Sequence, residues 1–502
     1  MFHMEQHLHL IFPVILPVIA GAALLVGKPF REDKRAGRMV LLSALGLELV
    51  LVAQALIKGG GMVLWRLTGA MDLVFQIDEI SVLFAALTSA VWLLVGIYGI
   101  SYMSHEHREN QFFGWYLIVL GVLIGLDFSG NLLTMYVFYE LMTLTSLPLV
   151  LHERTHQAVM AGLKYLFYSI AGAFLALFGI FFLAGITESL AFTPGGVMSR
   201  EIIAGKEGLF LAAVLCMLIG FGAKAGMFPL HGWLPTAHPE APAPASAVLS
   251  GIITKSGVMA VIRVVFYIVG PDHIRGTWVQ NVWILLSLLT VFMGSMLAYK
   301  EPVLKKRLAY STVSQVSYIL FGLSVLNPLA FAGALSHVVF HSLIKNALFL
   351  CSGAVITVTG RKRAGEMRGL GKIMPKTLFC YTIVSLGLVG IPPLCGFVSK
   401  WYLAAGALSS DTGVWSFLGP VVLLISALLT AGYLLPISLN GFFPGEETPW
   451  GDTCIPEEQG KKKEASLNML LPIGILTAGT VLFGIFPQSF FHTLFGIAER
   501  VF

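Results

Sequence analysis

Long apolar stretches recur from one end of this chain to the other, separated by short polar connections. A helix of roughly 20 apolar residues is long enough to span the hydrocarbon core of a bilayer. The composition agrees, since 56% of the 502 residues are hydrophobic and only 12% are charged. The sequence therefore predicts an all-α, polytopic membrane protein. The first apolar run, Leu8 to Val26, has no basic n-region and no small-residue cleavage site, so it is interpreted as a span and not as a signal peptide.

Hydropathy predicts fourteen transmembrane helices and no soluble domain. The longest connection, from Asn440 to Ser466, is acidic and then basic, and is predicted to be a solvated loop. The connection from Thr187 to Gly208 is predicted to be a surface hairpin or a short helix. The spans lie near residues 8–27, 38–57, 79–101, 112–128, 131–151, 161–184, 209–229, 242–268, 279–299, 308–325, 328–357, 377–402, 415–440 and 468–490.

Lysine and arginine are distributed unevenly over the connections. Of the 32 such residues, twenty follow odd-numbered spans, six follow even-numbered spans, and six lie within spans. Cytoplasmic loops carry the excess of Lys and Arg. We therefore expect the odd-numbered connections in the cytoplasm, and both termini on the extracytoplasmic side of the cell inner (cytoplasmic) membrane.

Motifs for handling electrons, nucleotides or metals are missing from the sequence. None of the five cysteines forms a Cys-x-x-Cys pair, no G-x-G-x-x-G follows a strand pattern, and no P-loop is present. The net charge of +5 is small, and the basic residues cluster in loops, which disfavours nucleic-acid binding. We expect no catalytic residue, cofactor or metal in this chain. Whether it is a subunit of an enzyme stays open.

Two spans contain glycine and proline where a helix would break. Proline removes a backbone donor, and the freed carbonyls are tolerated at membrane depth only beside protein or a watery cavity. Each break lies close to a lysine, Lys224 or Lys400, and such breaks in two halves indicate an inverted-repeat transporter. The alternative is ordinary proline kinking. The breaking residues are Gly220, Gly222, Gly226 and Pro229 in the seventh span, and Gly387, Gly390, Pro392, Pro393 and Gly396 in the twelfth.

Ionisable residues at membrane depth are the strongest functional signal. They are Glu140, Lys224, Lys255, Lys345 and Lys400. Such residues are expensive in lipid and usually mark an ion or proton path. The alternatives are a packing role for Glu140 among serines and threonines, and lysines that snorkel to an interface. Snorkelling fits Lys164 and Arg263, which lie nearer span ends.

The eleventh span carries His337, His341 and Lys345 at intervals of four, which places all three on one helical face. Histidine titrates near neutral pH and relays protons, so this face predicts stepping stones for a proton. Zinc binding is the rival interpretation, but no carboxylate or cysteine stands near to complete the site. His231, His238 and Glu240 follow the seventh span in an Ala/Pro-rich segment expected to be extended. That segment is either a proton entry route or a rigid turn.

These motifs resemble the antiporter-like subunits of complex I and their relatives, the proton-conducting membrane transporter family. The family includes the A and D subunits of Mrp antiporters and counterparts in membrane-bound hydrogenases. The resemblance covers most of the chain and is strongest over Gly220 to Gly257. It is carried by "FYELMTL", "GFGAKAGMFPLHGWLPTAHPEAPAPASAVLSGIITKSG", "LAYSTVSQ", "HVVFHSLIK" and "GIPPLCGFVSKW". The chain lacks the long C-terminal extension of the largest members and is similar to the shorter ones, including the Mrp D type.

The resemblance implies two inverted five-span repeats with broken seventh and twelfth helices. Four parts follow: residues 1–111 (spans 1–3), 112–268 (first repeat, spans 4–8), 269–440 (second repeat, spans 9–13) and 441–502 (a cytoplasmic loop and span 14). It also implies an order of proton transfer along the membrane. By analogy Glu140 pairs with Lys224, Lys255 is the central relay lysine, and Lys345 continues the path with His337 and His341. Lys400 is the terminal lysine, at a position where other members carry glutamate.

Three functions follow as hypotheses. The first is a proton-translocating subunit of a redox-driven complex, of the complex I or membrane-bound hydrogenase type. The second is a component of a Mrp-type Na+/H+ antiporter that resembles its D type. The third, a scaffold without transport, fits poorly with five retained membrane charges. We expect other membrane subunits as partners, with protons as the transported ion and Na+ as the alternative.

Overall fold

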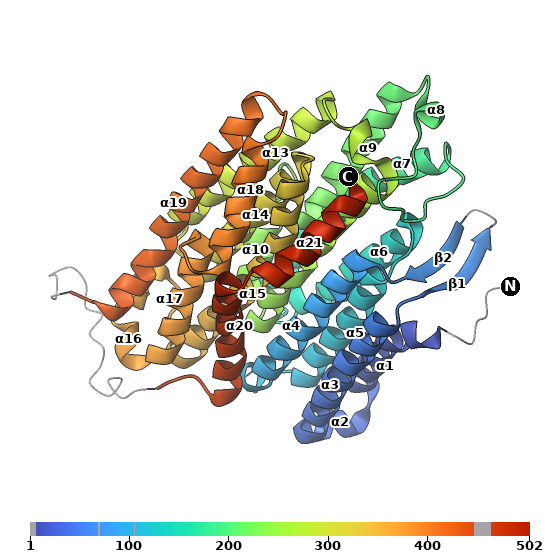
Figure 1. Cartoon of the computed structure of the whole chain (residues 1–502). Coiled ribbons are helices and arrows are strands. Elements are labelled where there is room, and N and C mark those ends of the chain that lie inside the picture. The colour runs from blue at the N-terminus through green and yellow to red at the C-terminus, as the bar shows by residue number, and fades with distance from the viewer. Residues whose placement is uncertain (1–6, 69–70, 105, 446–462) are drawn as a thin grey trace.

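A computed structural model describes residues 7–68, 71–104, 106–445 and 463–502. Long helices run side by side through the molecule, with a two-stranded β-hairpin at one end (Figure 1). The N-terminal part consists of η2 (Leu8–Leu10), α1 (Phe12–Val26), α2 (Lys28–Glu32), α3 (Lys34–Lys58), β1 (Gly61–Thr68), β2 (Met71–Gln76), α4 (Glu79–Met103), α5 (Glu109–Asp127), α6 (Leu132–Val150), α7 (His156–Ala184), α8 (Arg200–Ile203), α9 (Glu207–Ala225), α10 (Leu234–Glu240) and α11 (Ala243–Val248).

The chain continues through the central helices to a C-terminal helix that follows a kink. These elements are the π-helical η3 (Leu249–Ile253), α12 (Thr254–Ile262), the π-helical η4 (Arg263–Val269), η5 (Pro271–His273), α13 (Trp278–Lys300), α14 (Leu304–Ser324), α15 (Pro328–Thr359), η6 (Ala364–Met367), α16 (Leu370–Ile373), α17 (Pro375–Val389), α18 (Cys395–Leu408), α19 (Val414–Phe442), α20 (Leu467–Ile485) and α21 (Gln488–Val501).

The connections gather at two ends of the bundle. At one end, which we call the basic end, Nε of Arg38 lies 2.6 Å from Oε1 of Glu109. At the same end, Val303 forms an isolated β-bridge with Arg363. At the other, which we call the hairpin end, β2 bridges Ser129. Successive long helices therefore run in opposite directions, as the alternation of loop charges predicts. The basic end comprises the connections around residues 27–38, 104–111, 151–156, 300–307, 360–376 and 463–466. The hairpin end comprises the connections around residues 59–78, 128–131, 185–206, 270–277, 325–328, 409–414 and 485–502.

Within the described residues, 11 helices are long and apolar enough to cross a membrane. They coincide with eleven of the predicted spans, counting the Ala243–Val269 segment as one. The remaining predicted spans fall on α1, which has 15 residues, on α14, which has 21, and on the α17–α18 pair. A mostly helical membrane fold is thus confirmed.

Both predicted helix breaks are present. In the seventh span, α9 ends at Ala225 and α10 begins at Leu234. In the twelfth, α17 ends at Val389 and α18 begins at Cys395. The glycine after each first half, Gly226 or Gly390, has a positive φ (81° and 95°), which a residue with a side chain adopts only at a cost.

The prediction of an extended connector after the seventh span is wrong. The Ala/Pro-rich segment forms α10 and α11 instead, with only Ala241 and Pro242 between them. Proline is compatible with the first turn of a helix, where no intrahelical donor is needed, and Pro235 and Pro244 both occupy such positions.

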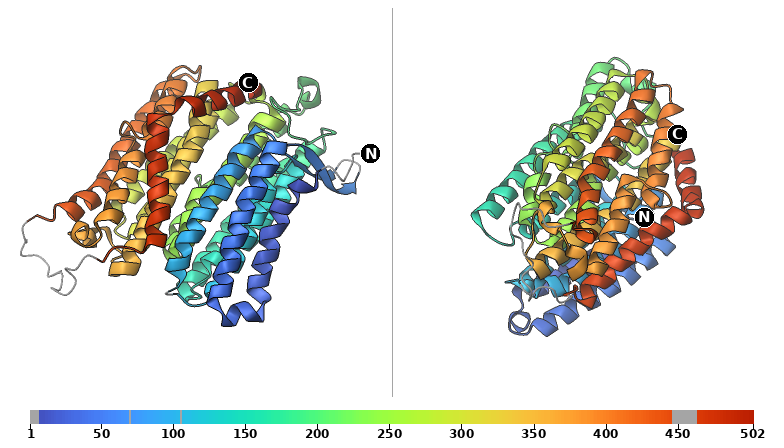
Figure 2. Two further views of the ribbon diagram at one scale, coloured as in Figure 1. Left: turned by 60° about the horizontal axis from the view of Figure 1, so that its bottom comes forward. Right: turned by 90° about the vertical axis from the view of Figure 1, so that its left-hand side faces the viewer.

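Two terminal features were not predicted. The strands β1 (Gly61–Thr68) and β2 (Met71–Gln76) pair antiparallel where the sequence predicted only a connection. The last span ends at Ile485, and the chain then turns into the amphipathic helix α21, which lies across the bundle against α15 and α18 (Figure 2). The predicted 187–208 connection contains the short helix α8. Most of the predicted acidic-then-basic loop, including Cys454, lies outside the described residues.

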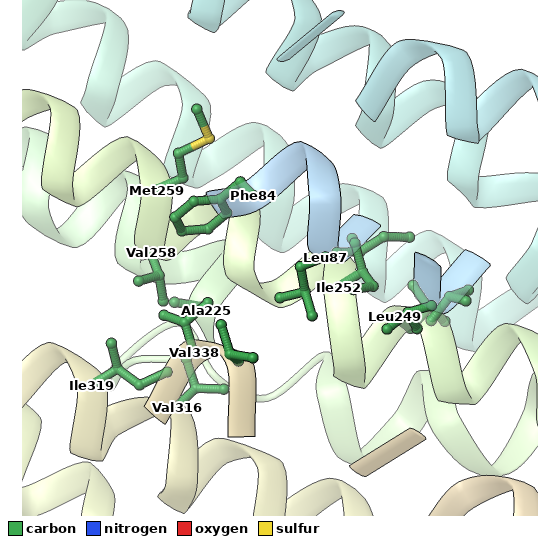
Figure 3. Packing of buried hydrophobic residues seen from close by; sticks show 14 of the residues in the cluster. Phe84, Leu87, Ala225, Leu249, Ile252, Val258, Met259, Val316, Ile319 and Val338 are labelled. Atoms are coloured by element: carbon green, nitrogen blue, oxygen red, sulfur yellow. The ribbon is translucent and has the colours of Figure 1, made fainter. Parts of the chain in front are cut away.

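The interior is densest around the eighth span. Every residue in the most apolar stretch of Ala243–Val269 is buried. In α3, only a third of the residues in the corresponding stretch are buried. Apolar side chains from α4, α9, α14 and α15 surround it, among them Phe84, Val316 and Val338 (Figure 3). Polar groups on this span are therefore enclosed by protein and not by lipid.

One glycine allows the seventh and eighth spans to approach closely. A Cβ at Gly257 would lie 2.6 Å from the carbonyl oxygen of Phe221 and 2.7 Å from the amide nitrogen of Ala225. Because both are backbone atoms, Gly257→Ala must push α9 away from α12, and we expect a loss of about 2 kcal/mol in stability. Thermal unfolding of the purified protein measures it. Gly474→Ala, in α20, is the matched control because nothing lies within 4 Å of its Cβ position. An unchanged melting temperature for Gly257→Ala would contradict this packing.

Candidate functional site

Lys224 lies in the last turn of α9, beside the first helix break, and is fully buried. Its ammonium group donates three hydrogen bonds to hydroxyl groups. These go to Thr143 on α6 at 2.8 Å, and to Tyr165 at 3.0 Å and Ser169 at 2.9 Å on α7. A cation is favoured here because the unpaired carbonyls of a helix C-terminus carry partial negative charge.

Glu140 lies one turn before Thr143 on α6 and is partly buried. Its charge interacts with that of Lys224, but the ammonium group bonds to hydroxyls and not to the carboxylate. Oε1 of Glu140 has no hydrogen-bond partner among the described residues. No hydrogen bond among the described residues joins the two groups, and they interact by charge across the hydroxyl cluster.

Lys255 occupies the first turn of α12, directly after the π-helical η3. Its Nζ donates to the carbonyl oxygen of Ser250 at 2.6 Å and lies 2.7 Å from Nδ1 of His341 on α15. Widened π turns leave carbonyls without their usual helical partner and are frequent at functional sites. The π segments were not predicted, and they explain how a buried ammonium group finds an acceptor within its own span.

His337 and His341 lie next to each other on one face of α15, as their spacing predicts. Their ring centroids are 5.8 Å apart, and Nδ1 of His337 lies 2.8 Å from the hydroxyl of Ser399 on α18. The Nε2 atoms of both rings have no partner among the described residues. Each ring can therefore accept or donate a further proton without breaking an existing hydrogen bond.

Lys400 ends this row of groups at the second helix break. Its Nζ donates to the carbonyl oxygens of Leu388 at 2.5 Å and Val389 at 3.1 Å, the last two residues of α17. The ring of Tyr318, on α14, lies between two relay groups: its centroid is 5.7 Å from that of His337 and 5.0 Å from Nζ of Lys400. Both lysines therefore lie at a helix break: Lys224 is in the last turn of α9, and Lys400 contacts the end of α17.

Lys345 continues the face of α15 toward the basic end. Its Nζ donates to the carbonyl oxygen of Leu308 at 3.0 Å. His238, on α10, is fully buried, and its ring stacks on that of Phe349 with the centroids 4.8 Å apart. Neither ring nitrogen of His238 has a hydrogen-bond partner among the described residues. The charges of Lys345 and Lys255 both act on His238.

Lys305 closes the basic end of this region. Its Nζ donates to the carbonyl oxygens of Ala241 at 2.6 Å and Pro239 at 3.2 Å, which leaves it buried beside the helix that carries His238. Glu153, in the connection between α6 and α7, faces the same group. Burial raises the pKa of Glu153, while the charge of Lys305 opposes that rise. His231 and Glu240 are only partly buried, which is compatible with both a proton entry route and a rigid turn in this segment.

Arg263 does not snorkel, and that expectation is wrong. The side chain is 0% exposed and forms a two-pronged ion pair with Asp78, the residue that caps α4. It also donates to Ser81 at 3.1 Å and stacks on the rings of Phe192 and Tyr267. A partner supplied by a distant connection removes the need to reach the lipid interface.

The ionisable groups are not joined by hydrogen bonds throughout. From Lys255 to Lys400 successive side chains are adjacent, but no hydrogen bond of the described residues joins Lys224 to Lys255. The described residues also contain no group of three His, Cys, Asp or Glu side chains with the arrangement of a metal site. Chemically, the row of amines, imidazoles and hydroxyls can pass protons one at a time.

Sequence reasoning missed several polar groups. Tyr318 and Ser399 gave no signal, because they are ordinary residues of apolar helices until the fold brings them to His337. Two carboxyl groups do carry a signal that could have found them. Glu48 on α3 and Asp127 on α5 are 1% and 2% exposed, and each lies within a predicted apolar span.

Comparison with known families gives two matches. The family described as "NADH:quinone oxidoreductase/Mrp antiporter, TM" matches residues 129–429, and "NADH-Ubiquinone oxidoreductase (complex I), chain 5 N-terminus" matches residues 65–113. A curated relative, the N subunit of the NADH-quinone oxidoreductase of Desulforudis audaxviator, is 33% identical over 76% of this chain and 75% of its own length. The D subunit of the Na(+)/H(+) antiporter of Alkalihalophilus pseudofirmus is 28% identical over 98% of this chain and 96% of its own.

Solved structures share the fold. A chain of the Mrp complex from a Dietzia species superimposes with a TM-score of 0.84 at 23% identity, covering 99% of this chain and 98% of that one. A chain of respiratory complex I from Thermus thermophilus gives 0.80 at 24% identity and covers 98% of each. A chain of an archaeal membrane-bound sulfane sulfur reductase gives 0.84 at 19% identity, covering 99% and 98%.

Proposed function

The chain belongs to the NADH:quinone oxidoreductase/Mrp antiporter family, and from this we propose that it is the antiporter-like, proton-translocating membrane subunit of a redox-driven ion-pumping complex. The drive comes from electron transfer in other subunits, because this sequence holds no redox motif. We further propose Glu140, Lys224, Lys255, His341, His337, Lys345 and Lys400 as the proton relay.

The observation that carries this proposal is the row from Lys255 through His341 and His337 to Lys400. Its ionisable groups come from three different elements and lie inside a membrane fold. Polar and ionisable groups at such depth are costly and are retained for function. The 2.7 Å contact of Lys255 with His341, the adjacent rings of His341 and His337, and the stacking of Tyr318 on His337 support a path along the membrane plane.

Charge interaction supplies the coupling. Two unit charges about 4 Å apart interact by about 4 kcal/mol at an effective dielectric near 20. A proton that leaves Lys400 therefore changes how strongly His337 and then Lys255 hold theirs. The same reasoning joins Lys224 to Glu140 across the hydroxyl cluster.

A D-type component of a Mrp-type Na+/H+ antiporter is the second candidate. The observation that favours it is the full-length likeness to the D subunit of such an antiporter, which extends over 98% of this chain. In that case ion gradients alone drive the same relay, and Na+ is the second transported ion. The partners in both cases are other membrane subunits of a multi-subunit complex.

We also propose the finer architecture. Adding α1, α14 and the α17–α18 pair to the 11 long apolar helices makes fourteen spans. Residues 112–268 and 269–440 are then two inverted five-span repeats, flanked by 1–111 and 441–502. The excess of Lys and Arg at the basic end supports a cytoplasmic location for that end, with both termini on the other side of the inner membrane.

The proposal is tested in the parent complex, purified with its partners and reconstituted in vesicles. Lys224→Ala removes the donor to three hydroxyls, and Glu140→Gln removes the acid that faces it; we expect each to slow proton transport by about 100-fold, the scale of a positioned proton carrier. Lys206→Ala, at an exposed position in the hairpin-end connection, is the control. Undiminished pumping by the assembled Lys224 and Glu140 variants would refute the assignment.

Transport measurements on the unaltered complex distinguish electron transfer from a Na+ gradient as the driving force. Proton uptake that starts only when an electron donor is added supports the redox-driven candidate. Proton movement that follows an imposed Na+ gradient without a donor supports the Mrp-type candidate. The subunits that co-purify give an independent answer.

A further inference from the structure

A small cavity adjoins Lys255 on the side facing α4 and α5. Its volume is about 10 Å³, and its polar lining consists of Thr88, Asp127, Lys255 and Ser256. Four apolar side chains complete the wall, including Phe84, Leu87 and Ile252 (Figure 3). This volume is about that needed for one water molecule, and a buried water needs two to four polar partners, which this lining supplies.

Asp127 is unusual for its position. It is the last residue of α5, and its side chain is 2% exposed. A carboxylate at a helix C-terminus faces the negative end of the helix dipole, and burying one is costly unless it is compensated. Its partner among the described side chains is the hydroxyl of Thr88, 3.0 Å from Oδ2. A single hydrogen bond from a neutral hydroxyl is poor compensation for a buried carboxylate.

Charged groups continue from Asp127 toward the hairpin end. The charge of Arg263 acts on Asp127, and Arg263 is itself paired with Asp78. The Asp78 side chain is 29% exposed, so it reaches the water at the surface. Lys255, Asp127, Arg263 and Asp78 thus form a polar line that leaves the Lys255–Lys400 row and leads to the surface.

We propose that Asp127 exchanges protons with Lys255 through one water held in this cavity, and that this branch connects the relay to the hairpin end. The inference rests on the proposed function. In the step, an N–H bond of the Lys255 ammonium breaks and its proton forms an O–H bond with the water. The water releases another of its protons to Asp127 by breaking an O–H bond of its own. An O–H bond forms on Asp127, which leaves a neutral amine and a neutral carboxylic acid.

The second half of the step returns Asp127 to its carboxylate. The O–H bond of Asp127 breaks and the proton goes to water at the hairpin end, since Asp127 ends α5 directly before the hairpin-end connection 128–131. The neutral amine of Lys255 then accepts another proton from His341. Arg263 does not carry the proton, because its guanidinium stays charged. Its positive charge instead favours the carboxylate form of Asp127 and so promotes release.

The test uses the parent complex reconstituted in vesicles with a pH-sensitive dye inside. Asp127→Asn keeps the size of the side chain and an acceptor for Thr88, but it cannot take up a proton. We expect it to slow proton transport by about 100-fold. Asp127→Glu, which keeps the carboxyl group, restores a large part of the rate. Thr88→Val is the control for packing, because it removes the hydrogen bond and leaves the carboxyl group in place.

A second readout does not depend on the transport rate. Infrared difference spectra of the working complex should contain the C=O stretch of a protonated carboxylic acid. That band should vanish in Asp127→Asn and shift in Thr88→Val. If Asp127→Asn fails to assemble, the Thr88→Val spectrum still tests the proposal. A C=O band that does not shift in Thr88→Val overturns it.

The outcomes separate this inference from the proposed function. Normal transport by assembled Asp127→Asn, while Lys255→Met is inactive, overturns the Asp127 branch and leaves the relay standing. Normal transport by both variants overturns the relay itself. Equal losses in Asp127→Asn, Asp127→Glu and Thr88→Val assign Asp127 a packing role and also overturn the branch.

Discussion

Complexes that carry Lys255→Met will assemble normally and transport protons about 100-fold or more slowly than the unaltered complex. The Nζ atom of Lys255 joins the carbonyl of Ser250 to His341, with contacts of 2.6 and 2.7 Å. Methionine has a similar length and no proton to give, so the path is cut at its centre. Proton uptake into vesicles, per assembled complex, measures the loss.

The fold should tolerate this change. An apolar side chain of similar volume in place of a buried charge is often neutral or stabilising. The carbonyl oxygen of Ser250 still accepts a hydrogen bond in this variant, because the hydroxyl of Thr254 donates to it at 2.8 Å. Lys300→Met, at the exposed basic end of α13, is the matched control and should transport normally. A normal rate for Lys255→Met would contradict the central position of this lysine.

The second large effect concerns stability. Asp78→Ala leaves the guanidinium of Arg263 0% exposed and without its ion pair. Breaking a buried pair by removing one partner typically costs 3–5 kcal/mol, and we expect about 3 here because the Asp78 side chain is 29% exposed. Thermal unfolding of the purified protein should show a clear fall in the melting temperature.

Two further variants test that explanation. Asp272→Ala breaks an exposed pair with Arg275, whose side chains are 80% and 49% exposed, so its effect should be small. Combining Asp78→Ala with Arg263→Met removes both charges and should recover much of the lost stability. If the double variant were no more stable than Asp78→Ala alone, an unpaired buried charge would not be the cause.

The same pair gives stability a dependence on acidity. Burial raises the pKa of Asp78, but the charge and hydrogen bonds of Arg263 outweigh it and hold the pKa below the ordinary value of 3.8. A carboxyl with a lowered pKa in the folded state stabilises the fold above its unfolded pKa. This contribution is therefore complete near neutral pH and is lost as the pH falls from 3.8 through the folded value.

The sequence was sufficient for the helical bundle and for locating the ionisable residues of the proposed relay. Apolar stretches of membrane length fix where spans lie, because lipid leaves the backbone no other partners than its own helix. The two breaks could also be predicted, because glycine and proline occur together there. A proline alone does not end a span, since Pro420 and Pro436 lie inside α19. The ionisable relay residues were found because each contradicts the apolar pattern around it.

What could not be predicted depends on which helices become neighbours. Tyr318 becomes part of the site only because α14 packs its ring between His337 and Lys400. The π turn before Lys255 has no sequence signature, and it supplies the Ser250 carbonyl. The prediction for Arg263 was wrong because its partner, Asp78, lies 185 residues away. A helix after the last span was not predicted because its apolar residues are periodic and not continuous.

The most direct test of the relay is a double-mutant cycle on its shortest link, Lys255 to His341. Proton transport is measured in vesicles for the unaltered complex, for Lys255→Met, for His341→Phe and for both together. Two groups that pass one proton act as a unit, so the double variant should be no slower than the slower single variant. Losses that multiply in the double variant, or a normal rate in either assembled single variant, would contradict a proton path through this pair.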